Sequence, residues 1–501
     1  MKHNRILSVI AFAGILGAAS SCGDGFLTVD NPTAAPIEDY FTTEPHLQEA
    51  LVAAYAPLHW TDWNGSQYNP LMIMSDIMAD QIWVGGNDKT DNQFWHMMMN
   101  YEATSEQTMK GIWSTAYSGV KRCNDLLTYL GWTEGLSEET AKAVEEQGRL
   151  LRVYYYSWLW KFWGNVVYYE QNLTAPFIGE QLKADAVYSK MIADLEAAIA
   201  LDALPMRQPD NKAGYLTKAF AYMLYAEIVM YQKDEARYGT ALGYMKEIIN
   251  DPGYDLSDYT TLFKHEGEWC QESIFEITYR ADGQVRSYDN PLGAGGTILC
   301  QLIGPYVMTE GSDDHKAGWG FAPVRKSTYD MYAAGDVRRD ATCYNATVNA
   351  YEPRYQDTGY FLEKYQGSQA DYATGDGAPD MRFGNNYRIY RYAETLLNAA
   401  ELALQSDPAS AKTWLNLVHN RAGLSDTVEA TLENIQKERA LEFVGEGKRY
   451  WDLIRWGLAS TVLVPDEIGY RTNTWSESKK YLPIPQSEID AAQGTLVQNN
   501  Y

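Results

Sequence analysis

The sequence predicts a mainly α-helical protein with minor β structure, and two observations carry that prediction. Apolar residues recur at steps of three and four, the spacing that places them on one face of a helix. The clearest such run is formed by Ala219, Tyr222, Met223, Ala226, Val229 and Met230. Strand-like runs are few, and the best of them covers residues 273–279. Helices are therefore expected to form the framework.

The helical period recurs along most of the chain. It covers residues 45–58, 111–130, 140–162, 185–200, 214–233, 238–250, 386–405, 409–420 and 430–457. The helices between 185 and 250 follow one another through short turns, and those between 386 and 420 repeat the arrangement. Such pairs resemble tetratricopeptide-type hairpins, in which each pair buries its apolar face against the next one. We therefore expect stacked helical pairs.

Two long stretches, 60–110 and 280–385, lack this period and are rich in Gly, Asn, Asp, Tyr and Trp. Loops of that length in a compact chain are usually functional or disordered, and their aromatic content argues against disorder. The whole chain has 38 Tyr and 15 Trp against 13 Phe, which favours rings that carry a polar group and suit wet surfaces. The aromatic-rich loops are therefore the expected binding surface.

The first 21 residues have the composition of a secretion signal. Lys2 and Arg5 give a basic start, and residues 6–19 form a mostly apolar run that is too short to span a bilayer. Small residues then lead directly into Cys22, as in a bacterial lipobox. We expect residues 1–21 to be removed and Cys22 to be acylated, for example with palmitate, which anchors the mature chain. The alternative is an ordinary secreted protein cut at a small-residue site.

The charge balance excludes one class of partner. Lys and Arg total 41 against 66 Asp and Glu, so the formal net charge is -25. A field of this sign repels polyphosphates, and we expect no nucleic-acid partner.

The cysteines downstream of Cys22 form no zinc or redox motif. They are Cys123, Cys270, Cys300 and Cys343, and none of them belongs to a C-x-x-C pair. Disulfides and free thiols are both compatible with this spacing.

The sequence offers little support for an enzyme. His265-Glu266 lacks the second histidine of a zinc-protease helix, and neither a G-x-S-x-G elbow nor a Walker A loop is present. A glycoside hydrolase needs two carboxylates about 5 to 10 Å apart, and no motif designates such a pair. We interpret the chain as non-catalytic and expect no cofactor. A glycoside hydrolase is the less favoured alternative.

The C-terminal region carries a dense series of charged and aromatic residues. It reads IQKERALEF over 435–443 and EGKRYWDLIRWG over 446–457. Further distinctive segments are QGRLLR at 147–152, NRAGL at 420–424 and YLPIPQSEI at 481–489. In this order, and together with the cysteine that follows the signal, they resemble the SusD/RagB family over essentially the whole chain.

This resemblance implies a SusD-like fold of tetratricopeptide-type helical pairs in an outer-membrane, cell-surface lipoprotein that captures glycans. It also implies a SusC-like TonB-dependent transporter as partner, with the lipoprotein as a lid over the barrel. We expect a single SusD-like domain over 22–501, with an N-terminal part of about 22–310 and a C-terminal RagB/SusD part of about 311–501. Non-carbohydrate nutrient capture and a protein-interaction scaffold are the alternatives.

We call residues 435–457 the signature. Its charged residues alternate in sign at helical spacing, which favours ion pairs within the framework over ligand contacts. They are Glu438, Arg439, Glu442, Arg449, Asp452 and Arg455. The many rings between 154 and 163 surround every face of one helix, so we expect them to pack in the core.

A sugar ring presents C–H groups on its face and hydroxyls around its edge, so its binding site needs an aromatic platform and nearby polar groups. Residues 83–95 have that composition, with Trp83 and Trp95 at the ends and Asn87 and Asp88 between them. We expect the two Trp rings to form the platform and the two polar side chains to contact the sugar edge. Trp95 is equally compatible with packing beneath the loop.

The second loop region adds Arg286, Tyr288, Trp319 and Arg382 as candidate glycan contacts. Trp319 lies between glycines too small to bury it, which favours an exposed ring. Arg382 is suited to hydroxyls or to a pair with Asp380. Because the chain is so acidic, we expect neutral glycans such as fructans, glucans or mannans.

Two acidic segments invite comparison with calcium sites. Residues 313–315 and 371–380 contain several Asp side chains, but neither matches an EF-hand loop. Solvated acidic loops explain them better, and we expect no metal.

Overall fold

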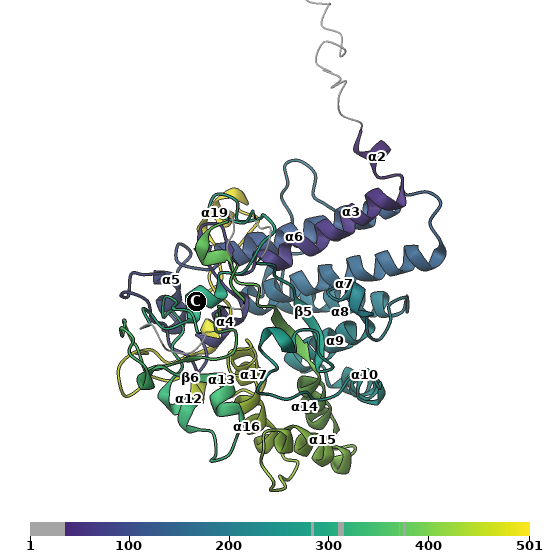
Figure 1. Ribbon diagram of the computed structural model, residues 1–501. Helices are drawn as coiled ribbons and strands as arrows, with labels where there is room; N and C mark the ends of the chain where they lie inside the picture. The colour runs from purple at the N-terminus through teal and green to yellow at the C-terminus, as the bar shows by residue number, and fades with distance from the viewer. Residues whose placement is uncertain (1–35, 282–284, 309–314, 370, 374–376) are drawn as a thin grey trace, which may run out of the picture.

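The computed structural model describes residues 36–281, 285–308, 315–369, 371–373 and 377–501 (Figure 1). The expected signal segment and its lipidation site Cys22 lie outside these residues, and so do Asp313 and Asp314. None of the helices in the described part combines the length and apolar character needed to cross a bilayer.

The long helices form one continuous array in which each helix packs on the next. In chain order they are α3 (Glu44–Tyr55), α6 (Lys110–Leu130), α7 (Glu138–Trp163), α8 (Ala184–Ile199), α9 (Lys218–Gln232), α10 (Tyr238–Asn250), α14 (Tyr392–Ala403) and α15 (Pro408–Arg421). Figure 1 shows them descending along the right-hand side of the molecule, with the irregular segments on the left. The mainly α fold with stacked helical pairs is therefore confirmed.

Local sequence sets the ends of these helices. The Ser137 hydroxyl accepts a hydrogen bond from the Thr140 amide at the start of α7, and acidic residues fill the first turn. The same helix ends at Gly164, whose φ of +67° suits glycine and whose Cβ, if it had one, would lie 2.6 Å from the Tyr481 ring. The helix therefore begins and ends where its sequence provides a cap and a stop.

Close approach of α6 and α7 depends on one glycine. A Cβ on Gly119 would lie 2.4 Å from the ring of Tyr155, so only glycine lets that ring pack against α6. The rings of residues 154–163 are all buried, as expected for core residues.

Helix α10 packs on α14 although some 140 residues separate them in the sequence, so the second loop region is an insertion into the array. Strand β8 (Tyr387–Arg391) precedes α14 and pairs antiparallel with β5 (Ser273–Ile277). The helix expected from residue 386 is therefore wrong over its first residues, because pairing with a buried strand satisfies this backbone instead.

The helix expected over 430–457 is interrupted. It consists of α16 (Leu432–Glu442) and α17 (Arg449–Arg455), and the turn between them contains Gly447 with a φ of +73°. A Cβ on Gly447 would lie 2.9 Å from the Cα of Met72, so the turn lets the chain approach helix α4 (Leu71–Asp76) closely.

The remaining elements are short. The other helices are α2 (Ile37–Tyr40), α4 (Leu71–Asp76), α5 (Gln93–Met99), α11 (Leu299–Ile303), α12 (Lys326–Asp330), α13 (Arg338–Thr342), α18 (Ala459–Val462) and α19 (Gln486–Ala491). The other strands are β1 (Trp63–Asn64), β2 (Gln67–Tyr68), β3 (Val166–Val167), β4 (Gln181–Leu182), β6 (Cys343–Asn345) and β7 (Tyr360–Leu362). The pairs β1–β2, β3–β4 and β6–β7 are antiparallel.

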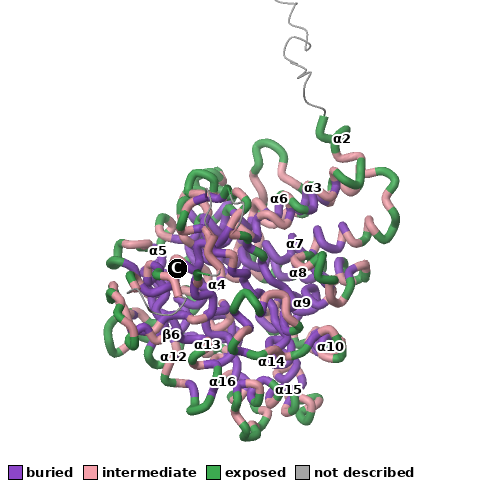
Figure 2. The backbone as a smooth tube through the Cα atoms, viewed as in Figure 1, coloured by how far each residue is buried: buried purple, intermediate pink, exposed green. Residues whose placement is uncertain are grey.

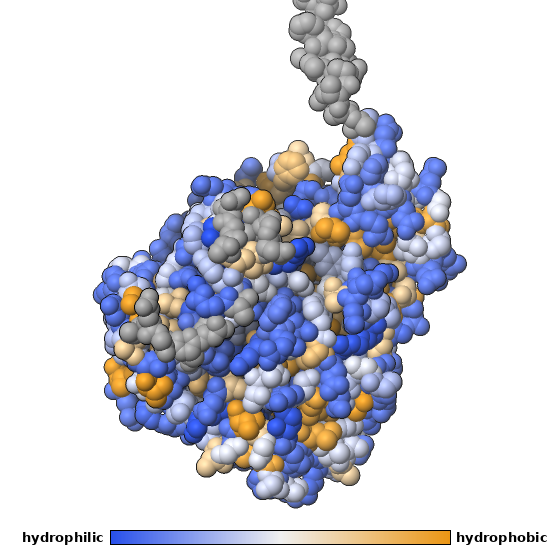
Figure 3. Space-filling model, in the orientation of Figure 1, coloured by the Kyte–Doolittle hydropathy of each residue, from blue (hydrophilic) through white to orange (hydrophobic). Residues whose placement is uncertain are grey.

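Buried backbone runs through the helical array and continues beneath the loops, while exposed backbone is concentrated at the periphery (Figure 2). The surface in Figure 3 is mostly hydrophilic and carries scattered apolar patches. All four cysteines between Cys123 and Cys343 are free thiols, which resolves the alternative that their spacing left open.

Candidate functional site

Four rings from three separate segments meet on the loop side of the molecule. Trp63 and Tyr68 of the β1–β2 hairpin have ring centres 4.6 Å apart. Tyr288 lies edge-on to Trp63 at 5.4 Å, and Trp319 lies edge-on to Tyr68 at 5.4 Å. Tyr288 is 39% exposed, and Tyr68 and Trp319 are half-buried. We call Trp63, Tyr68, Tyr288 and Trp319 the ring cluster.

Backbone hydrogen bonds hold Trp319 in place. Its amide donates to the Gln301 carbonyl at 2.7 Å, and the flanking Gly318 and Gly320 amides donate to Pro305 and Gly304 at 2.7 and 2.8 Å. A Cβ on Gly318 would lie 2.6 Å from Gly304, so this glycine is required by close packing. The glycines thus position the ring rather than simply leaving it uncovered.

The two loop regions that the sequence separates are joined in space. Residues 82–86 run beside residues 320–324, with the amides of Trp83 and Gly85 donating to Pro323 and Phe321 at 2.9 and 3.0 Å. Both candidate loops therefore contribute to one surface.

The phenols of the ring cluster are neutral groups at physiological pH. The Tyr288 hydroxyl donates to Asp380 at 2.8 Å, and burial together with that carboxylate raises the pKa of Tyr288. Burial likewise raises the pKa of Tyr68. The cluster can therefore offer ring faces and neutral hydroxyls to a ligand.

Arg354 links Trp319 to the first loop. Its guanidinium donates to the Trp319 carbonyl at 2.8 Å, lies 4.4 Å from the centre of the Tyr306 ring and approaches the carboxylate of Asp91 at 3.7 Å. The same Asp91 carboxylate accepts the Asn87 amide at 2.9 Å. The charge of Arg354 is thus compensated within the protein.

Asn87 and Asp88 are exposed at the tip of that first loop, as a role at a ligand edge requires. Asp88 accepts hydrogen bonds from the Thr90 hydroxyl and amide at 2.6 and 2.7 Å, which lower its pKa. It is therefore a carboxylate with acceptor capacity directed to solvent.

The interpretation of both Trp residues of the first loop as platform rings is wrong. Trp83 is 3% exposed, and the Arg325 guanidinium covers its ring at 3.3 Å. Trp95 is fully buried, and its indole nitrogen donates to the Tyr68 carbonyl at 2.7 Å. A ring without exposed faces cannot stack on a sugar, so Trp95 anchors the backbone of Tyr68 and Trp83 belongs to the core.

Arg286 is likewise wrong as a ligand contact. It is 1% exposed and forms a closed ion pair with Asp62 at 2.6 Å, with a further bond to the Gly296 carbonyl at 3.0 Å. Arg382 is half-buried and donates to the Gly377 carbonyl at 2.6 Å, while Asp380 receives Tyr288. The structure therefore places Tyr288, Trp319, Asn87 and Asp88 at the surface and turns Arg286 inward.

Sequence reasoning missed Trp63, Tyr68, Tyr306 and Arg354. Trp63 and Tyr68 belong to the two strands of a hairpin whose turn is Gly65-Ser66, and that short turn signal was available in the sequence. Tyr306 and Arg354 had no local signal, because only the folding of the loops brings them beside Trp319.

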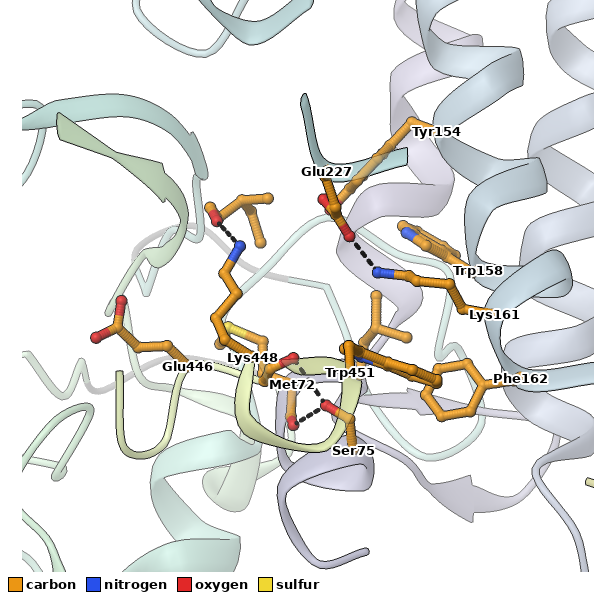
Figure 4. A pocket seen from close by; sticks show the side chains of 13 residues that line it. Met72, Ser75, Tyr154, Trp158, Lys161, Phe162, Glu227, Glu446, Lys448 and Trp451 are labelled. Atoms are coloured by element: carbon orange, nitrogen blue, oxygen red, sulfur yellow. Dashed lines mark hydrogen bonds and ion pairs between the residues drawn. The ribbon is translucent and has the colours of Figure 1, made fainter. Parts of the chain in front are cut away.

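The interior beneath the signature contains a cavity of about 50 Å³ that is too small for a sugar. Figure 4 shows Lys161 directed at Glu227 and Lys448 directed at a backbone carbonyl, which is that of Ile389 at 3.1 Å. Glu227 and Lys161 form an ion pair. This cavity is part of the framework.

Metal-ligating side chains do not gather anywhere in the described part of the chain: no group of three His, Cys, Asp or Glu residues there is arranged to hold an ion.

The fold and these contacts together describe a helical-repeat protein that presents a cluster of aromatic rings on its loops. Two family models match the chain: one described as "SusD family" over residues 271–501, and one described as "Starch-binding associating with outer membrane" over residues 26–229. The chain belongs to the SusD family, which confirms the resemblance drawn from its motifs.

Solved structures of similar proteins agree with this family assignment. Surface glycan-binding protein A from Bacteroides thetaiotaomicron is 57% identical, with a TM-score of 0.89 over 92% of this chain and 100% of that chain. The same protein in complex with laminarihexaose is 56% identical, with the same TM-score and coverage. A laminarin binding SusD-like protein is 28% identical, with a TM-score of 0.82 over 91% of this chain and 99% of that chain.

Proposed function

We propose that this protein binds a neutral β-1,3-linked glucan at the ring cluster. The observation that supports this most directly is the half-exposed group of Tyr68, Tyr288 and Trp319 in a chain 56% identical to a protein solved with laminarihexaose bound. Ring faces supply contact area for the sugar C–H groups, and the phenols, Asn87 and Asp88 supply hydrogen bonds to hydroxyls.

Charge supports a neutral ligand. The formal net charge is -25, and the carboxylates of Asp88 and Asp380 lie at or beside the site. Arg354 is already engaged by the Trp319 carbonyl and by Asp91, and the exposed Lys89 stands beside the carboxylate of Asp88. Sulfated or uronate-rich polymers would therefore meet net repulsion.

The protein acts as a binding protein rather than an enzyme in this proposal, since its relatives are described by binding. The glycan passes to a SusC-like TonB-dependent transporter, and acylation of Cys22 anchors the chain at the cell surface; both steps rest on family membership and on the N-terminal sequence. Replacing Cys22 with Ser tests the anchor: the protein should leave the membrane fraction, and retention there would contradict lipid anchoring.

Affinity electrophoresis through gels that contain laminarin, a β-1,4-glucan, a fructan or an acidic polysaccharide tests the ligand. We expect retardation by laminarin without release of reducing sugar, and its loss in Trp319→Ala at a cost of about 2 kcal/mol, roughly thirtyfold in affinity. The matched control is Trp132→Ala, which removes another half-buried Trp beyond the far end of α6. No retardation by laminarin, or equal loss in both variants, would contradict the proposal.

A further inference from the structure

A concave surface lies beside the β1–β2 hairpin and is not part of the ring cluster. It has a volume of about 520 Å³, within the range typical of ligand sites. Three segments form it: helix α6, residues 167–179, and α19 with the chain that follows it (Figure 1). We call it the α6–α19 groove.

The lining of this groove combines aromatic rings with neutral polar groups. The rings of Tyr117 and Tyr169 are 6.1 Å apart and within 12° of parallel, and Trp113 lies 5.1 Å from Tyr117. Ser118 and Asn172 add a hydroxyl and an amide to the lining. This is the combination that a sugar chain requires, with ring faces for its C–H groups and hydrogen-bonding groups for its hydroxyls.

Charge in the groove is sparse and partly compensated. Lys121 pairs with Asp125 at 2.7 Å, so its ammonium is neutralised one helical turn away. Glu488 of α19 is the acidic residue among the lining side chains. The groove therefore shares the neutral to mildly acidic character of the ring cluster, which suits the same class of ligand.

Phe177 at the groove is exposed in a way that core packing does not explain. Its ring is 71% exposed, and its backbone has a φ of +62°, a conformation uncommon for a bulky residue. The Phe177 amide donates to the Thr174 carbonyl at 2.7 Å, which fixes the turn that presents the ring. A large ring held outward beside other rings marks a contact surface.

One residue links the groove to the ring cluster. Asn64, the neighbour of Trp63 in β1, donates to the hydroxyl of Thr115 at 2.8 Å and lies 3.5 Å from the hydroxyl of Ser114, which lines the groove. Asn64 thus contacts the wall of the groove, while its chain neighbour Trp63 belongs to the ring cluster.

We propose that the α6–α19 groove is a second contact for the same neutral glucan chain that the ring cluster binds. This inference rests on the proposed function of the ring cluster. A chain long enough to reach both surfaces gains affinity, because its second contact forms at a high effective concentration. A glycan too short to reach the groove contacts the ring cluster alone.

Titration calorimetry with a laminari-oligosaccharide series, from the trisaccharide to laminarin, tests the proposal. Ser118→Phe fills the groove, and Phe177→Ala removes its exposed ring without disturbing the core. Ile468→Ala, which truncates a residue 63% exposed and absent from the groove lining, is the matched control. We expect both groove variants to weaken laminarin binding about threefold to tenfold while the trisaccharide binds as to the unmodified protein.

Equal affinities of the unmodified and variant proteins at every chain length would overturn the proposal. The groove would then be a candidate contact for a protein partner instead. An equal loss at every length, the trisaccharide included, would also overturn it, because the variants would then act through the ring cluster. Failure of the unmodified protein to bind laminarin would remove the proposed function, and this inference with it.

Discussion

The buried ionic cluster beneath the signature and the ring cluster on the loops use opposite chemistry. The ionic cluster consists of Glu272, Lys364, Arg391, Arg421, Glu442 and Glu446, all nearly or fully inaccessible to solvent. Arg391 alone contacts Glu272, Glu442 and Glu446 at 2.6, 2.9 and 2.7 Å. The ring cluster is neutral and lies at the surface.

This difference shows what each part of the sequence does. Burial alone would raise the pKa of Glu442, but Arg421, Arg391 and Arg338 outweigh it and lower that pKa. Such groups must be present together, because a charge left unpaired in the interior is costly. The signature therefore encodes the framework, while the ring cluster is assembled from three segments that lie far apart in the sequence.

Arg391→Met should give the largest effect in the molecule, because it leaves Glu272, Glu442 and Glu446 short of a cation. We expect the free energy of unfolding to fall by about 3 to 5 kcal/mol, measured by urea denaturation. Arg339→Met is the matched control, because Arg339 pairs with Asp340 at the surface; its cost should be at most about 0.5 kcal/mol. Equal costs would erase the contrast between buried and exposed pairs.

Trp83→Phe tests whether this buried Trp belongs to the framework or to the ligand site. We expect the free energy of unfolding to fall by about 2 kcal/mol, because the smaller ring leaves a void beneath Arg325. Laminarin affinity should stay within about twofold, since no face of Trp83 is exposed. A large loss of affinity at unchanged stability would place Trp83 in the site after all.

Asp76 is another buried carboxyl, and among the described residues it forms no ion pair. Its carboxylate accepts the Gly447 amide at 2.9 Å, its other oxygen is buried without a hydrogen bond, and burial raises its pKa to about 8. The unfolded pKa is about 3.9, so between these values the folded state binds an extra proton, and stability falls as pH rises.

Asp76→Asn should abolish this dependence of stability on pH. The stability of the variant relative to the unmodified protein should rise from pH 5 to pH 8 by at most about 1.4 kcal/mol per pH unit and then level off. Urea denaturation across this pH range measures it, with Asp210→Asn at an exposed turn as control. A difference independent of pH would mean that Asp76 is ionised in the folded protein.

Asp88→Ala should have the smallest effect, since an exposed acceptor contributes one hydrogen bond to a hydroxyl. We expect laminarin affinity to fall about twofold to fivefold, roughly 0.5 to 1 kcal/mol, by titration calorimetry. Lys89→Ala, at the next exposed position, should leave it unchanged. Equal affinities of the two variants would remove Asp88 from the site.

Much of the fold was predictable because it depends on local periodicity. Helices α6 and α7 lie within two residues of the expected ranges, and strand β5 lies within its predicted run. The prediction failed at residues 387–391, where pairing with β5 overrides the helical pattern that continues into α14. A pattern that extends over neighbouring residues cannot show where a long-range partner takes over.

The candidate site was predictable only in part. Composition identified both loops, and Tyr288, Trp319, Asn87 and Asp88 do lie at the surface. Composition could not separate exposed rings from buried ones, because the type of a residue does not show what will pack against it.

The sequence alone determined the helical array, the framework role of the signature charges and the family, since caps, periodicity and motifs are local properties. Only the tertiary structure decided which rings face solvent. Trp95 is buried and its indole nitrogen donates to the Tyr68 carbonyl, whereas Trp319 is presented because residues 301–305 hold its backbone. Exposure depends on what packs against a residue, and some of those contacts come from distant segments, as where Phe321 packs near Trp95 and Arg325 covers Trp83.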